Sequence, residues 1–279
     1  MFSGECVLLG ASVQGFSHKR QNKLNQDAIT WQQNLVGKLP VILAVADGHG
    51  SAKNFRSHKG SDFAVKVAIN TLNEFWANIE AVDNVSSIKR LAEEKLPREI
   101  VDRWLKIVQY DLDKNPLTDS EMELVGNSAV AYGSTLLAVL ATDAFILFLQ
   151  LGDGDMLIVS EENNVSRAIP KDPRLIANET TSLCVPESWR DLKLAFLPVN
   201  DFPKMILLST DGYSNSFNDD QDFFQVAFDL RKILEEKSFE FLSSNIDSWL
   251  NETSEKGSGD DITAGIIFFC EENDSLTKE

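Results

Sequence analysis

The segment LPVILAVADGHGS, residues 39–51, joins an apolar run to an ending with chemically versatile side chains. Residues 41–46 are all apolar, which is typical of a strand buried on both faces. The run ends in DGHG, where the carboxylate of Asp47 and the imidazole of His49 lie among glycines. Because Asp-Gly is a favoured turn dipeptide, this ending by itself predicts either a turn or a functional site.

The same pattern recurs along the chain, since other apolar runs also adjoin aspartates. These are Asp153 and Asp155 after FILFLQL, Asp211 after MILLST, and Asp260 with Asp261 before ITAGIIFF. Carboxylates at the ends of interior strands repel one another unless a cation lies between them. Oxygen ligands without cysteine and with few histidines favour magnesium, manganese or calcium over zinc. The pattern therefore predicts a site for hard divalent cations.

The composition excludes several classes of partner. The chain has 279 residues, with 43 Asp and Glu against 26 Lys and Arg, and a formal charge of -17. Such a charge repels nucleic acid and anionic membranes, so we expect neither as a partner. The first residues lack the pattern of a signal peptide and no long apolar segment follows, which predicts a cytoplasmic protein. Three widely spaced cysteines indicate no disulfide framework.

The periodicity predicts one domain over residues 1–279, in which helices cover sheets. We expect strands at residues 6–13, 27–31, 41–46, 134–142, 144–160, 204–210 and 261–270, and helical segments at residues 62–79, 88–112 and 220–250. The turn at Thr142-Asp143 predicts a hairpin, and Pro97 predicts either a kink or a new helix. Residues 115–131 are expected to form a loop, and residues 161–203 a long irregular insertion.

Six segments, in this order, resemble the metal-dependent protein phosphatases of type 2C, and in particular their bacterial branch. They are NQDA, VADGHGS, YGSTLLAVL, LGDGDMLIV, LLSTDGYSN and GSGDDITAGI. The resemblance spans most of the chain and implies an α+β fold, a four-layer αββα sandwich with two central antiparallel sheets between helices. It also implies two Mn²⁺ or Mg²⁺ ions at one end of the sandwich. The insertion would form a flap beside them.

The resemblance assigns the metal ligands residue by residue. Asp47 would bridge both cations, and the carbonyl of Gly48 would complete the coordination of one. Asp211 and Asp260 would bind the other cation. Asp153 matches an aspartate that helps to hold a weaker third ion in some members. The cations would activate a shared water as a hydroxide that attacks phosphorus in line.

Two further residues match catalytic positions of the family. Asp27 matches an acidic residue that orients metal-bound water. His49 matches a histidine proposed as the general acid that protonates the departing serine or threonine oxygen, a contribution of about 10²- to 10⁴-fold. A turn residue is the alternative reading of His49.

The chain departs from the family at three positions. Gln26 stands where many members have a glutamate ligand, so its neutral amide predicts weaker metal binding or an intervening water. The usual phosphate-binding arginine is displaced, which leaves Arg20, with His18 beside it, as the candidates for phosphate binding. A solvated basic loop is the alternative for these two residues. Asp261 stands where many members have an asparagine, and we expect it to support the metal ligands without binding the metal itself.

These features lead to one principal hypothesis and two alternatives. The principal one is a monomeric phosphatase that hydrolyses phosphoserine and phosphothreonine in proteins and opposes a serine/threonine kinase. The first alternative is an inactive pseudophosphatase that binds a partner, which the neutral Gln26 keeps open. The second is a metal-dependent phosphodiesterase or nuclease, against which the negative charge of the chain argues.

Overall fold

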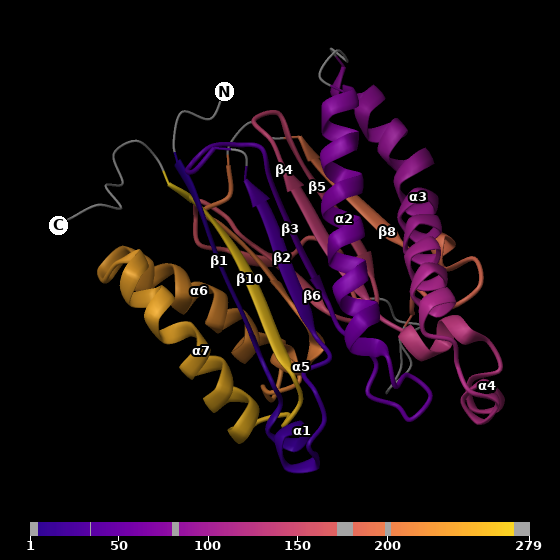
Figure 1. The fold of residues 1–279 in the computed structure, drawn as a ribbon. Helices are drawn as coiled ribbons and strands as arrows, with labels where there is room; N and C mark the ends of the chain where they lie inside the picture. The colour runs from indigo at the N-terminus through magenta and orange to yellow at the C-terminus, as the bar shows by residue number, and fades with distance from the viewer. Residues whose placement is uncertain (1–4, 34, 80–83, 172–180, 199–201, 271–279) are drawn as a thin grey trace.

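The computed structural model describes residues 5–33, 35–79, 84–171, 181–198 and 202–270. Within these residues the strands form two five-stranded antiparallel sheets that pack face to face, with helices on both outer faces (Figure 1). This architecture confirms the α+β class and the four-layer αββα sandwich.

Each sheet combines strands that are distant in the sequence. The first has the order β2-β3-β4-β5-β8, with β2 (Ala28–Gln33), β3 (Val41–Ala46), β4 (Leu136–Ala141), β5 (Phe145–Leu151) and β8 (Lys193–Pro198). The second has the order β1-β10-β9-β6-β7, with β1 (Glu5–Val13), β10 (Ile262–Cys270), β9 (Met205–Ser209), β6 (Asp155–Val159) and β7 (Val165–Arg167).

Four long helices form the outer layers. They are α2 (Ser57–Ile79) and α3 (Val85–Lys114) on the first sheet, and α6 (Asp220–Glu236) and α7 (Phe239–Lys256) on the second. The shorter helices are α1 (Phe16–Gln21), α4 (Asp119–Val125) and α5 (Asp211–Ser214), with 3₁₀ turns at Ser128–Tyr132 and Ser188–Arg190. Figure 1 places α1 and α5 together at one end of the sandwich, away from both chain termini.

Three apolar layers hold the sandwich together. One lies between the two sheets and includes Leu43, Val139 and Ile206, and the other two lie between each sheet and its helices. The central strands are covered on both faces, which explains why β3, β4, β5 and β10 are buried along their whole length.

The predicted strand over residues 144–160 is wrong in one respect, because the chain changes sheets in its middle. The hairpin through Thr142-Asp143 is confirmed, and β5 pairs with β4 in the first sheet. At Gly152 the backbone has φ 110°, a conformation that favours glycine. The chain then enters β6, which pairs with β9 in the second sheet. Asp153 therefore lies in the crossing between the two sheets.

The predicted irregular insertion over residues 161–203 is partly wrong. Its described residues contain β7 and β8, and each of these strands forms one edge of a sheet. Residues 172–180 of this insertion lie outside the described residues. The flap-like role of the insertion stays a prediction.

Local sequence signals explain the other differences. Residues 115–131 contain α4, which begins with a reciprocal capping box between Thr118 and Glu121, a pattern legible in TDSE. Pro97 lies inside α3 without ending it. The helical segment at residues 220–250 is two helices, because the Ser238 side chain caps a new helix by accepting from the Phe241 amide.

The acidic strand ends meet at one end of the sandwich. The connections at this end are β1–β2, which contains α1, the segments after β3 and β9, the β5–β6 crossing, and the segment before β10. Antiparallel pairing brings these ends together, because β3 and β9 finish where β4, β6 and β10 begin. Among the described residues, none of the helices has the length and apolar character needed to cross a membrane.

Candidate metal centre

The DGHG segment leaves β3 as an ordered connection. The amide of Asp47 donates to the hydroxyl of Thr135 at 2.9 Å, and the Thr135 amide donates back to the Asp47 carbonyl at 2.8 Å. The amide of Gly48 donates to the carbonyl of Gln26 at 3.1 Å. A Cβ atom at position 48 would lie 2.6 Å from that same carbonyl oxygen, so only glycine allows this approach.

Asp47 is partly buried, and its carboxyl group lies among other aspartates. Burial raises its pKa well above the ordinary range, and the negative charges of Asp27, Asp211, Asp260 and Asp153 raise it further. The acidic strand ends, which the sequence pattern predicts to converge, lie close enough together to interact. Several negatively charged carboxylates this close together favour the binding of protons or cations between them.

Asp211 shows the same effect from the other sheet. It begins α5 directly after β9, and burial raises its pKa to about 6, with further contributions from Asp153 and Asp260. Its interaction with Asp47 partly opposes this rise. The two sheets therefore each contribute a carboxyl group to the same cluster.

Asp27 is held in place by the second sheet. The hydroxyl of Thr210 donates to Asp27 Oδ2 at 2.8 Å, and the Thr210 oxygen accepts from the Thr263 amide at 3.0 Å. Burial raises the pKa of Asp27 well above its ordinary range, and the charge of Asp261 adds to this effect. Thr210 occupies the N-cap position of α5 without capping it, because its hydroxyl is committed to Asp27.

Gln26 offers an oxygen suited to a cation. Its amide nitrogen donates to the hydroxyl of Ser57 at 2.8 Å, which sets the orientation of the side chain. The amide oxygen Oε1 is buried and has no hydrogen-bond partner. A buried, unpartnered oxygen next to a carboxylate cluster fits the donor set of a hard divalent cation. The residues present therefore fit Mn²⁺ or Mg²⁺, with Gln26 as a neutral oxygen donor.

His49 is half-buried beside this cluster, and its amide donates to the carbonyl of Gly133 at 3.1 Å. Burial lowers the pKa of the imidazole, and the charge of Asp153 partly opposes this. A Cβ atom at Gly133 would lie 2.8 Å from His49 Cδ2, so the glycine makes room for the ring.

Two aspartates of the sequence pattern have other partners. Asp155 pairs with Arg167 Nε at 2.5 Å, and Arg167 also binds Asp220 of α6, so Asp155 ties β6 and β7 to that helix. Asp261 accepts backbone hydrogen bonds from Gly15 at Oδ1 and from Gln26 at Oδ2, at 2.6 and 2.7 Å. These contacts agree with the expectation that Asp261 supports the site.

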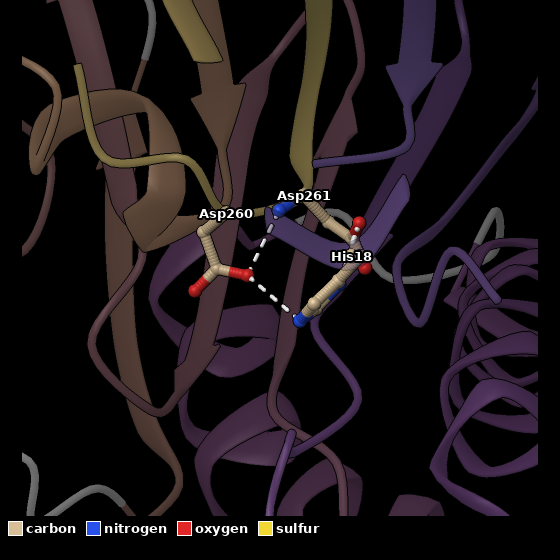
Figure 2. Close-up of side chains that lie close together, drawn as sticks. All are labelled: His18, Asp260 and Asp261. Carbon is tan, nitrogen blue, oxygen red and sulfur yellow. Dashed lines mark hydrogen bonds and ion pairs between the residues drawn. The ribbon is translucent and has the colours of Figure 1, made fainter. Parts of the chain in front are cut away.

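His18 and Arg20 lie on α1 in different surroundings. Figure 2 shows His18 against Asp260 and Asp261, with Nδ1 2.9 Å from Asp261 Oδ1 and Nε2 3.6 Å from Asp260 Oδ1. One potential ligand atom from each of these residues lies within 4.8 Å of the others. Because both Asp261 oxygens already accept backbone hydrogen bonds, we interpret this group as a structural contact. The guanidinium of Arg20 lies 6.0 Å from the centre of the Phe16 ring.

Sequence reasoning did not find the residues that hold the cluster in place. Ser57, Thr210 and Thr263 are ordinary polar residues in the sequence, and their roles depend on contacts between distant elements. For Thr210, the position directly before Asp211 is the one available signal.

Comparisons with known proteins identify the family of the chain. The family model described as Protein phosphatase 2C matches residues 14–251. The chain belongs to the protein phosphatase 2C family. A search of curated proteins found no match.

Solved structures share the fold at low sequence identity. The serine/threonine phosphatase Stp1 from Staphylococcus aureus is 14% identical, with a TM-score of 0.58 over 97% of this chain and 96% of that one. PppA, described as a regulatory component of the T6SS in Pseudomonas aeruginosa, is 19% identical, with a TM-score of 0.59 over 95% and 98%. The catalytic domain of the phosphatase PstP, solved with two manganese ions, is 13% identical, with a TM-score of 0.58 over 96% and 100%.

Proposed function

We propose that this protein is a phosphatase that hydrolyses phosphoserine and phosphothreonine in proteins with the help of two Mn²⁺ or Mg²⁺ ions. The observation that carries the proposal is the partly buried cluster of Asp27, Asp47 and Asp211, whose pKa values are all raised by burial and by neighbouring carboxylates. Membership of the protein phosphatase 2C family supports the reaction class.

Each candidate residue has a place in this proposal. Asp47, with the Gly48 carbonyl and Gln26 Oε1, would hold one cation, and Asp47 with Asp211 and Asp260 the other. Asp153 would serve a weaker third ion. When bound, the cations would supply an activated water and neutralise charge on the phosphoryl oxygens. Asp27, fixed by Thr210, would orient that water by accepting its hydrogen bond.

His49 would donate a proton to the oxygen of the departing side chain. Its lowered pKa makes the protonated ring a stronger acid, although a smaller fraction of the protein then carries the proton at neutral pH. The charge of Asp153 favours the protonated ring, as would a bound phosphate dianion. His49 would therefore take up its proton when the substrate binds.

Arg20 is our candidate for holding the phosphate, because a guanidinium can donate two parallel hydrogen bonds to phosphate oxygens. His18 faces Asp260 and Asp261 with its two ring nitrogens, so we assign it a supporting role in the phosphate site. We further propose that residues 1–279 form one catalytic domain that acts as a cytoplasmic monomer on substrates of a serine/threonine kinase.

The direct test is an assay of the purified protein with Mn²⁺ and with EDTA. We expect hydrolysis of p-nitrophenyl phosphate and of a phosphothreonine peptide with Mn²⁺, and loss of both activities in EDTA. Hydrolysis that survives chelation would contradict the proposal. Faster cleavage of bis-p-nitrophenyl phosphate than of the monoester would favour a phosphodiesterase instead.

Gln26 favours a second candidate, a pseudophosphatase that binds a partner without turnover, because a neutral donor attracts a cation less than a carboxylate does. In the variant Gln26→Glu, we expect Mn²⁺ to bind roughly tenfold more tightly, equivalent to about 1.4 kcal/mol. The Ser57 hydroxyl can turn its hydrogen towards the new carboxylate, so the substitution preserves that contact.

Calorimetric titration with Mn²⁺ measures this change. Gln221→Glu, at an exposed position in the first turn of α6, is the control for the added charge and should leave the affinity unchanged. An unchanged Mn²⁺ affinity in Gln26→Glu would show that Gln26 is not a metal ligand. Catalysis that appears only in Gln26→Glu would identify the wild-type protein as a pseudophosphatase.

A further inference from the structure

The segment between β1 and β2, residues 14–27, carries groups from both halves of the proposed active site. Arg20, the phosphate candidate, lies near its middle on α1, and Gln26 and Asp27 lie at its end beside the carboxylate cluster. The placement of this segment therefore determines where Arg20 lies relative to the metal site.

Asp261 contacts both ends of this segment. Its Oδ1 accepts from the Gly15 amide at 2.6 Å, and its Oδ2 accepts from the Gln26 amide at 2.7 Å. The residue is only 4% exposed, so water competes little for these two hydrogen bonds. His18 Nδ1 lies 2.9 Å from Oδ1 and adds a contact from the middle of the segment.

Further contacts hold the beginning of the segment. The Ser17 amide donates to the Gly259 carbonyl at 2.8 Å, and the Phe16 amide donates to the Ser254 hydroxyl at 3.0 Å. A Cβ atom at Gly15 would lie 2.4 Å from the carbonyl carbon of Asp260, which shows how closely the two chains approach.

We propose that Asp261 is a positioning residue that fixes both ends of residues 15–26 and thereby sets the position of Arg20 relative to the metal site. This inference rests on the function proposed above. A carboxylate suits the role because it presents two acceptor oxygens to two N–H donors. An asparagine would present one acceptor, and its NH₂ group would face the second N–H donor.

Hydrogen exchange of the Asp261→Asn variant tests the contacts without any catalysis. We expect exchange of the Gly15 and Gln26 amides to become roughly 10- to 100-fold faster, because a hydrogen bond to a charged buried group is replaced by a poor contact. The control is Asp219→Asn, since Asp219 also accepts two backbone hydrogen bonds but does so at the start of α6. It should leave exchange in residues 15–26 unchanged.

The kinetic test separates positioning from general stability. For a phosphothreonine peptide, Asp261→Asn should lower kcat/KM by about tenfold, mainly through KM, and should weaken competitive inhibition by inorganic phosphate. The loss should fall on KM because Arg20 lies between Gly15 and Gln26, the two residues whose amides lose their shared acceptor. Gln26 and Asp27 keep their contacts with Gly48 and Thr210.

Two results would overturn the inference: unchanged exchange in residues 15–26, or faster exchange with unchanged KM and phosphate inhibition. If the wild-type protein has no phosphatase activity, calorimetric binding of inorganic phosphate in the presence of Mn²⁺ takes the place of KM, so the two proposals fail separately. If Asp261→Asn does not fold, the wild-type protein still decides the matter. Its Gln26 amide should be protected like those of the central strands, and rapid exchange there would contradict the role of Asp261.

Discussion

Replacing Asp47 with asparagine should abolish Mn²⁺-dependent phosphatase activity while it stabilises the metal-free protein. Asp47 is the proposed bridge between both cations, so its loss should lower kcat/KM by about 10³-fold or more. In the absence of metal the same carboxyl group is buried against like charges. Its neutral replacement should therefore raise the free energy of unfolding at pH 8 in EDTA by about 1–3 kcal/mol.

A matched control separates this local effect from the change in net charge. Asp143 lies exposed in the turn between β4 and β5, so Asp143→Asn should change neither activity nor stability appreciably. Activity is measured on a phosphothreonine peptide, and stability by thermal unfolding in EDTA. An active Asp47→Asn variant would refute the role assigned to Asp47, and a less stable metal-free variant would contradict the predicted repulsion.

The metal-free protein should lose stability as the pH rises from about 4 to 6, whereas most proteins gain stability as the pH rises out of the acid range. Burial and neighbouring charges raise the pKa of Asp211 from its ordinary value of 3.8 to about 6 in the folded protein. The folded protein then binds more protons than the unfolded chain. This contribution is complete below pH 4 and is lost as the pH rises through 6.

The expected size follows from the shift, which for Asp211 corresponds to about 3 kcal/mol. Asp27 and Asp47 act in the same direction, because their pKa values are also raised. Saturating Mn²⁺ should reverse the trend, since cations bind the deprotonated carboxylates. At 100 times its dissociation constant a ligand adds about 2.7 kcal/mol.

Thermal unfolding between pH 4 and 8, in EDTA and in Mn²⁺, measures both curves. We expect the melting temperature in EDTA to fall with pH, and the difference between the two conditions to widen. A melting temperature in EDTA that rises steadily over this range, with no added stability from Mn²⁺ at pH 8, would show that the carboxylates do not repel one another in the folded protein.

The fold was predictable where burial alone determines the pattern. Strands such as β3 and β10 are continuous apolar runs because both of their faces are covered, and such runs are legible in one sequence. The change of sheet at Gly152 was not predicted, because it depends on a backbone conformation in a segment whose flanks are both apolar. Strand β8 was missed because it lies at a sheet edge and is less apolar and less buried than the central strands.

The candidate site was also predictable only in part. Aspartates after apolar runs predicted the cluster, because antiparallel strands bring their ends together at one edge of the sandwich. The sequence indicated a supporting role for Asp261 but not the contacts by which it acts, because its hydrogen bond with Gly15 spans 246 positions of the sequence. Such a contact leaves no local pattern. The buried oxygen of Gln26 likewise appears only when the partner of its amide nitrogen, Ser57, is known.

The most direct test of the central claim is an anomalous difference map from a crystal of the protein grown with Mn²⁺. We predict two strong peaks that share the carboxylate of Asp47, one of them also bound by Asp211 and Asp260 and the other adjacent to the Gly48 carbonyl and Gln26 Oε1. A map without a peak among Asp47, Asp211 and Asp260 at a saturating Mn²⁺ concentration would contradict the account.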